Sequence, residues 1–168
     1  KQWKFLKVRG IKMKTIIYGF GLMGKKIYHA VKNNEAFDLI GVVSYEFDQQ
    51  IDEPMYTKLA ECTQKADIII DFSHPNNLDD ILTYALKNNT KLVLATTGFT
   101  NEQLNKIEEA SHQIPIFQSY NTSFGMQMVT KILRDVAKEF YENGFDIEIV
   151  EKHHNKKIDA PSGTAKLL

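Results

Sequence analysis

The stretch Thr15-Ile16-Ile17-Tyr18-Gly19-Phe20-Gly21-Leu22-Met23-Gly24 decides the fold, because it joins an apolar segment directly to a glycine-rich loop. Its first four residues predict a short strand. Residues 25–32 predict a helix, since Ile27, Ala30 and Val31 recur at helical spacing. A G-x-G-x-x-G sequence between a strand and a helix is the context that dinucleotide binding requires, and a plain glycine turn in an α/β domain is the alternative.

Each glycine of this loop has a separate expected role. Gly19 permits the tight turn, and Gly21 lets the backbone approach a pyrophosphate at the helix N-terminus. Gly24 lets the helix pack closely on the strand. Leu22 and Met23 complete the loop, so all five residues are expected at the cofactor site.

The chain beyond this loop alternates short apolar runs with helical patterns. The apolar runs, which suit strands buried on both faces of a parallel sheet, are residues 39–43, 68–70, 92–95 and 114–117. Residues 77–87 and 101–111 carry helical spacing, and Thr100 and Gln103 stand at capping-box spacing. This alternation implies right-handed βαβ units and predicts an α/β, Rossmann-type domain with a parallel sheet.

The pattern changes after residue 122. Residues 124–141 predict a long helix that Asn143-Gly144 ends. Residues 145–149 alternate apolar and acidic side chains, as in a sheet with one solvated face. We therefore expect an extension over 1–12, a dinucleotide-binding domain over 13–122, and over 123–168 the start of an α+β domain with a mixed or antiparallel sheet.

The most reactive stretch is Glu151-Lys152-His153-His154-Asn155-Lys156-Lys157-Ile158-Asp159-Ala160-Pro161-Ser162-Gly163-Thr164. Buried charges must be paired, so this composition favours a site for an anionic substrate over a core segment. Lysines supply positive charge, histidines can move protons near neutral pH, and Ser162-Gly163-Thr164 offers backbone N–H groups if it opens a helix. A solvated basic loop is the alternative.

These motifs resemble the dihydrodipicolinate reductase family. Residues 151–164 match its pattern E-x-H-H-x-x-K-x-D-x-P-S-G-T at every fixed position, and Met23 matches its G-x-G-x-M-G loop. Two further matches are Ala95-Thr96-Thr97-Gly98 and Asp71-Phe72-Ser73 followed by Pro75. The resemblance extends from Met13 to the last residue. Because the family is longer, it also implies a C-terminally truncated chain.

The resemblance implies a cytoplasmic NAD(P)H-dependent oxidoreductase of lysine and diaminopimelate biosynthesis, tetrameric at full length. It would reduce a cyclic dicarboxylate, 4-hydroxy-tetrahydrodipicolinate. His153 and Lys157 are the implied catalytic residues, with Lys157 favoured as proton donor and His153 as the alternative. The implied substrate contacts are His154, Lys157, Ser162, Gly163 and Thr164.

The resemblance also places residues around the cofactor. Besides the glycine loop, these are Phe72, Ser73, Ala95, Thr96, Thr97, Gly98, Ser119, Tyr120, Asn121 and Thr122; Phe72 could equally be plain core. The family position that often carries an acidic residue for the ribose 2′-hydroxyl falls on Tyr45, and Glu46 is next. No arginine stands nearby, although Lys25 and Lys26 could meet a 2′-phosphate. The sequence favours NADH and leaves NADPH open.

Composition excludes other function classes. The net charge is 0, from 21 basic and 21 acidic residues, which argues against a general nucleic-acid binder. No apolar run reaches the length of a membrane span. Cys62 is the only cysteine, and His29, His74 and His112 lack metal-ligand spacing, so no metal is expected. Residues 1–12 alternate basic and apolar side chains, and we interpret them as an extension before Met13.

Two other functions remain open at this stage. One is a different NAD(P)-dependent dehydrogenase on the same fold. The other is a domain that senses nicotinamide nucleotides without catalysis. A sensing domain would leave the basic cluster of residues 151–164 unexplained.

Overall fold

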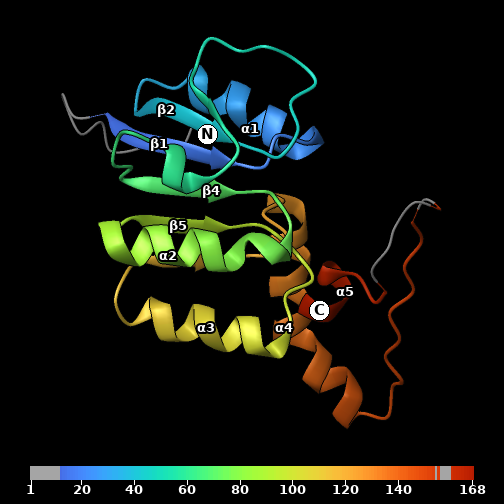
Figure 1. The fold of residues 1–168 in the computed structure, drawn as a ribbon. Coiled ribbons are helices and arrows are strands. Elements are labelled where there is room, and N and C mark those ends of the chain that lie inside the picture. Colours follow the sequence, from blue (N-terminus) through green and yellow to red (C-terminus); the bar gives the residue numbers. More distant parts are fainter. Residues whose placement is uncertain (1–11, 154, 156–159) are drawn as a thin grey trace. The chain divides into compact units, whose positions relative to one another are not determined.

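The computed structural model describes residues 12–153, 155 and 160–168 (Figure 1). The chain divides into two compact units, Lys1–Gln118 and Ser119–Leu168, here called unit 1 and unit 2.

In the described part of unit 1, six strands form one parallel sheet with the order β3-β2-β1-β4-β5-β6. The strands are β1 (Met13–Tyr18), β2 (Phe37–Val43), β3 (Met55–Tyr56), β4 (Ile68–Asp71), β5 (Lys91–Leu94) and β6 (Ile116–Gln118). The order reverses between β1 and β4, so the crevice outside their carboxyl ends is the switch point at which such sheets bind ligands. This confirms the predicted Rossmann-type parallel sheet.

Helices cover both faces of this sheet (Figure 1). They are α1 (Leu22–Lys32), α2 (Leu78–Asn88) and α3 (Asn101–Ser111), with the 3-10 turns η1 (Leu59–Glu61) and η2 (Pro75–Asn77). Neighbouring residues of β1 point to opposite faces: Ile16 packs in the cluster of α2 and α3, and Ile17 in the cluster of α1. Both are fully buried, which explains why the central strands are apolar without alternation.

The predicted elements occur with adjusted boundaries. α1 begins at Leu22 rather than at residue 25, because the last residues of the glycine loop already form its first turn. α3 has the predicted bounds, and its capping box is formed: Gln103 N donates to Thr100 Oγ1 at 3.2 Å, and Thr100 N donates to Gln103 Oε1 at 3.0 Å. β6 begins at Ile116, since Pro115 has no N–H for the ladder. β3, η1 and η2 are not predicted by the sequence pattern.

Unit 2 contains α4 (Phe124–Glu142) and the short α5 (Gly163–Leu167). α4 ends at Glu142, and the predicted Asn143-Gly144 follows it, with Asn143 as the C-cap and Gly144 at a φ of +85°. The strand predicted over residues 145–149 is not formed: residues 145–150 pair with no strand in the described part of the chain. An alternating pattern shows which faces suit a sheet, but a strand also needs a partner for its N–H and C=O groups.

Candidate functional site

The glycine loop between β1 and α1 contains glycines that packing requires and one that it does not. Gly19 has a φ of +96°, and a Cβ on it would lie 2.5 Å from the Phe72 carbonyl oxygen. A Cβ on Gly24 would lie 1.9 Å from the Gly19 carbonyl oxygen. Backbone packing therefore requires glycine at both positions.

Gly21 differs from its neighbours. It is the N-cap residue of α1 with a φ of −74°, which any residue can adopt, and a Cβ on it would meet no atom within 4 Å. Packing therefore leaves open space at Gly21, beside the N-terminal N–H groups of α1. Such N–H groups and the positive end of the helix dipole favour an anionic group. The loop fits a pyrophosphate.

The ends of β4 and β5 are joined by a buried polar cluster. The Asp71 carboxylate is 1% exposed and accepts from Ser73 N at 3.0 Å and Ser73 Oγ at 2.6 Å. Ser73 N also donates to Thr96 Oγ1 at 3.0 Å. Burial raises the pKa of Asp71, and hydrogen bonds from Ser73 and Thr96 offset part of that rise. Ser73 and Thr96 thus hold two strand ends together, while Thr97 and Gly98 are exposed at the same edge.

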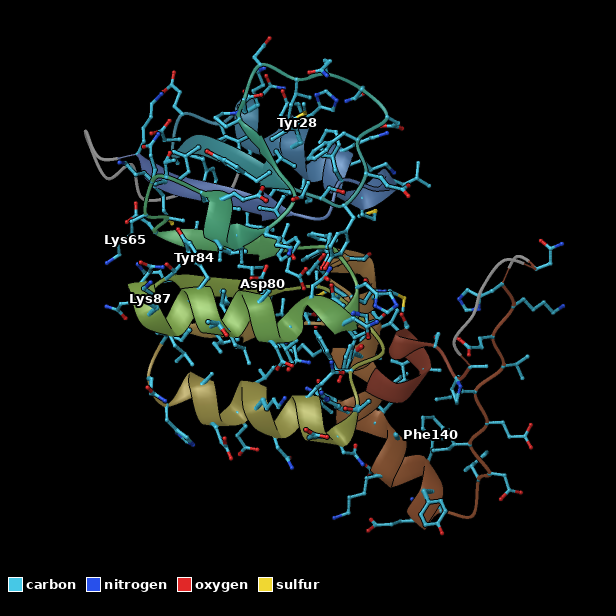
Figure 2. The ribbon with its side chains drawn as sticks, viewed as in Figure 1. Tyr28, Lys65, Asp80, Tyr84, Lys87 and Phe140 are labelled. Carbon is cyan, nitrogen blue, oxygen red and sulfur yellow. The ribbon has the colours of Figure 1, made fainter. Side chains whose placement is uncertain are left out.

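The segment after β2 is tied to α1 by charged pairs. Lys25 pairs with Asp48, and Lys32 Nζ lies 2.8 Å from Asp52 Oδ2 and 3.1 Å from Glu53 Oε1. The hydroxyl of Tyr28, labelled on α1 in Figure 2, donates to Glu53 Oε2 at 2.5 Å. Lys25 is therefore already engaged by a carboxylate. Glu46 lies exposed in the same segment, and its carbonyl accepts from Ser44 Oγ at 2.8 Å.

Two of the predicted catalytic and substrate residues, His154 and Lys157, lie outside the described residues, as do Lys156 and Asp159. Of the other site residues in unit 2, His153 approaches Glu151: the His153 Nδ1 to Glu151 Oε2 distance is 3.7 Å. Glu151 Oε1 also accepts from Ser162 N at 2.8 Å. Glu151 therefore joins the histidine to the Pro-Ser-Gly-Thr turn.

The turn opens a helix, as anticipated. Ser162 is the N-cap of α5, and its Oγ accepts from Ala165 N at 3.1 Å. Thr164 Oγ1 accepts from Asn121 Nδ2 at 3.0 Å. Asn121 also accepts from Ser119 Oγ, Ser123 N and Gln127 Nε2, so this predicted cofactor residue holds the segment 119–127 together. The position of Glu151 beside the basic cluster indicates a role in orienting it, but no local pattern indicates that Glu151 accepts from Ser162 N or that Asn121 holds the segment 119–127.

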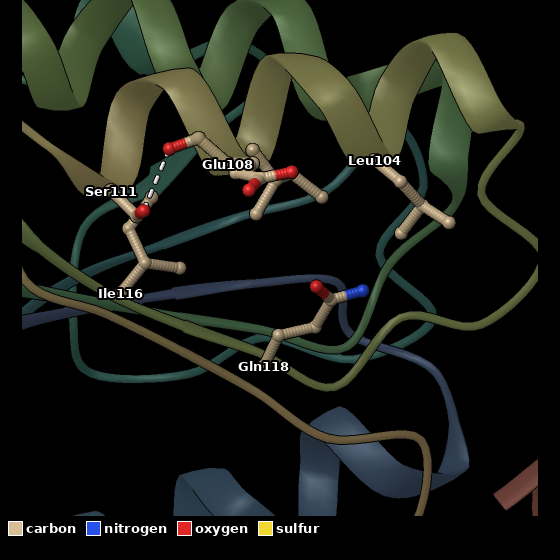
Figure 3. A pocket seen from close by; sticks show the side chains of 6 residues that line it. Leu104, Glu108, Ser111, Ile116 and Gln118 are labelled. Carbon is tan, nitrogen blue, oxygen red and sulfur yellow. Dashed lines mark hydrogen bonds between the residues drawn. The ribbon is translucent and has the colours of Figure 1, made fainter.

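A hollow of about 330 Å³ in unit 1 is lined by none of the predicted site residues (Figure 3). Leu104, Glu108 and Ser111 of α3 face Ile116 and Gln118 of β6 across it. Gln118 Nε2 is buried there with no hydrogen-bond partner among the described residues. The described residues hold no cluster of histidine, cysteine or carboxylate side chains suited to a metal, and none of their helices is long and apolar enough to cross a membrane.

Comparison with known families gives two adjacent matches. Residues 13–122 match the family described as dihydrodipicolinate reductase, N-terminus. Residues 125–168 match dihydrodipicolinate reductase, C-terminus.

Curated relatives agree with these matches. The 4-hydroxy-tetrahydrodipicolinate reductase of Clostridium novyi (strain NT) is 45% identical over 156 residues, covering 92% of this chain and 62% of that protein. The enzyme of the same name from Exiguobacterium sibiricum is 46% identical over 156 residues, covering 93% and 60%. The chain thus spans about three fifths of the length of the curated relatives it matches.

Solved structures show the same fold. A dipicolinate-bound dihydrodipicolinate reductase from Paenisporosarcina sp. TG-14 superposes with a TM-score of 0.74 at 30% identity, covering 93% of this chain and 63% of that one. A scyllo-inositol dehydrogenase from Lactobacillus casei with bound NAD(H) has a TM-score of 0.54 at 15% identity, covering 80% and 42%. The second similarity concerns the fold alone.

Asp71 generates a testable pH dependence. The pKa of Asp71 is higher in the folded protein than in the unfolded chain. Its contribution to stability is therefore fully present at a pH below the unfolded-state pKa, and it is lost as pH rises through the folded-state pKa. Relative to Asp71→Asn, the unfolding free energy of the parent should fall as pH rises from about 4 towards 7, by roughly 1.4 kcal/mol for each unit by which the pKa is raised. Urea denaturation across this range measures it.

The control for this measurement is Asp38→Asn, which removes one exposed carboxylate from β2. A difference between the parent and Asp71→Asn that stays constant with pH would show that Asp71 has no raised pKa.

Proposed function

The chain belongs to the dihydrodipicolinate reductase family, and from this premise we propose that it binds NADH or NADPH and reduces 4-hydroxy-tetrahydrodipicolinate to tetrahydrodipicolinate in lysine and diaminopimelate biosynthesis. The observation that carries this proposal is the glycine loop. Packing requires Gly19 and Gly24, but the open space at Gly21 is explained by a ligand. The relatives named as reductases favour this function over a nucleotide sensor.

The cofactor site lies at the carboxyl edge of the parallel sheet in unit 1. The pyrophosphate would meet Gly21, Leu22 and Met23 at the start of α1. The other proposed contacts on this edge are Glu46, Phe72, Ser73, Ala95, Thr96, Thr97 and Gly98. The family resemblance supports Ser119, Tyr120, Asn121 and Thr122 as further cofactor contacts. The cofactor, once bound, supplies the hydride, and the protein's own residues orient it.

The substrate site is proposed in the motif of residues 151–164. The Paenisporosarcina relative was solved with dipicolinate, a cyclic dicarboxylate, and we propose the same class of substrate for this chain. Ser162 Oγ and Thr164 Oγ1 each accept a hydrogen bond, which leaves both hydroxyl hydrogens available to a carboxylate. His154 and Lys157 would add positive charge.

The proton that completes the reduction would come from Lys157, with His153 as the alternative donor. General acids act on the transition state, so the donor must be held in place. Glu151 can hold His153 in place, because Glu151 Oε2 lies beside His153 Nδ1 while Glu151 Oε1 accepts a hydrogen bond from Ser162 N. The proposal assigns Glu151 a positioning role.

The domain arrangement completes the proposal. We place the nucleotide-binding domain at residues 13–122 and the start of an α+β substrate domain at residues 123–168. The apolar side chains Phe145, Ile147 and Ile149 are 58%, 49% and 52% exposed, which supports pairing of this segment with a strand in a mixed or antiparallel sheet. The family resemblance supports a cytoplasmic location and a homotetramer. Light scattering of the full-length protein would test the oligomeric state.

Gly21→Val tests the cofactor site. The Cβ of the valine meets no atom within 4 Å and the φ of this residue is common, so the variant should fold, yet its side chain extends into the space proposed for the pyrophosphate. Affinity for NADH, measured by fluorescence titration, should fall at least about tenfold. Gly24→Ala is the contrasting variant. Its Cβ would clash with backbone atoms, so this substitution should lower the melting temperature. Equal NADH affinity in the parent and Gly21→Val would refute the site.

Glu46→Gln tests cofactor preference. A carboxylate accepts a hydrogen bond from the ribose 2′-hydroxyl and repels a 2′-phosphate, so the variant should bind NADPH better relative to NADH by a few fold. Titration of both cofactors measures this ratio. Glu35→Gln removes an equal charge before β2, at the opposite edge of the sheet, and should leave the ratio unchanged. An unchanged ratio in Glu46→Gln would assign the preference to another residue.

Lys157→Ala tests the chemistry in the full-length enzyme. Loss of the general acid should lower kcat about 10²–10⁴-fold while NADH binding is retained, because the proposed cofactor site lies mainly in unit 1. Lys156→Ala, which removes the neighbouring charge, is the matched control. Near-normal turnover in Lys157→Ala would exclude Lys157 as the acid and leave His153.

A further inference from the structure

Tyr45 is an exposed aromatic residue that is nevertheless tethered. It follows β2 directly after Ser44, and 66% of it is exposed. Its hydroxyl donates to Asn77 Oδ1 at 2.9 Å. Asn77 is 4% exposed and is the N-cap of α2, in the segment that follows β4. The ring is therefore held at its backbone and at its hydroxyl, with its surface open to solvent.

The tether is part of a polar network across three strand ends. Asn77 N is itself bonded to the His74 carbonyl at 2.9 Å, which fixes the acceptor. Tyr18 ends β1, is 1% exposed and donates to Asp80 Oδ2 at 3.1 Å; Figure 2 labels Asp80 on α2. Burial raises the pKa of Tyr18, with Asp80 and the nearby Tyr45 adding to the rise. The Tyr45 ring thus connects the end of β2 to the start of α2.

In a doubly wound sheet this position lies beside the adenosine half of a bound dinucleotide. In doubly wound sheets the ligand lies across the carboxyl ends of the strands at the switch point, and its adenosine ribose meets the end of the second strand. Here β2 is that strand, and it lies next to β1 and two places from β4 in the sheet (Figure 1). Tyr45 extends from the end of β2 towards the segment after β4, along the side where the base would lie.

We infer that Tyr45 is the stacking surface for the adenine base of the cofactor, and this inference rests on the proposed function. Aromatic side chains stack on nucleobases because both present π faces. A ring already fixed at both ends loses little conformational freedom on binding. Since adenine is common to NADH and NADPH, Tyr45 strengthens the binding of both cofactors equally, whereas Glu46 distinguishes between them.

The test is calorimetric titration of the chain with ADP and with NADH. Tyr45→Ala should weaken both ligands by the same factor, roughly 5- to 150-fold, as expected for the loss of one base–aromatic stack. Tyr45→Phe keeps the ring and loses only the bond to Asn77, so its affinity should fall less than about threefold. Tyr141→Ala is the matched control, because it removes an exposed tyrosine, 72% exposed, from α4.

A second variant, Tyr45→Leu, separates stacking from simple bulk. It should bind ADP as weakly as Tyr45→Ala; if it binds like Tyr45→Phe, stacking is refuted. Parental ADP affinity in Tyr45→Ala would also overturn the inference, while the loss in Gly21→Val would still support the proposed function. A parent that binds neither NADH nor ADP would instead refute the proposed function itself.

Discussion

The contact on which unit 1 depends is the close approach of two backbones at the start of α1. The helix passes so near the Gly19 carbonyl that a Cβ on Gly24 would lie 1.9 Å from it. A Cβ on Gly19 would lie 2.5 Å from the carbonyl oxygen of Phe72, the residue that follows β4. These contacts fix the N-terminus of α1 above the point where the strand order reverses. The open space at Gly21 and its helix dipole follow from that placement.

Hydrogen bonds between distant residues then complete the edge of the sheet. Asp71, Ser73 and Thr96 join β4 to β5, and Tyr45 and Asn77 join the end of β2 to the start of α2. These polar groups are buried or tethered beside the candidate cofactor site. Each bond removes freedom from a strand end, so the edge is shaped before any ligand arrives.

Much of this fold could be predicted from the sequence, because strands buried on both faces have continuous apolar runs and α3 has a complete capping box. β3, with two residues, has too short a pattern to detect. No strand forms over residues 145–149 among the described residues, because the alternating pattern contains no information about a partner strand. For the site, the glycine roles followed from local geometry. Tyr45 with Asn77, 32 residues apart, and Glu151 with Ser162 are tertiary pairs that no local pattern indicates.

The difference between Gly21 and its neighbours has a consequence for how substitutions are tolerated in a living cell. A replacement at Gly19 or Gly24 would damage folding, so the altered protein would be removed by proteases along with other unfolded chains. A replacement at Gly21 would spare the fold, since the added Cβ meets no atom within 4 Å. The cell would then accumulate folded protein with an altered candidate cofactor site, and selection on Gly21 would act through binding rather than through folding.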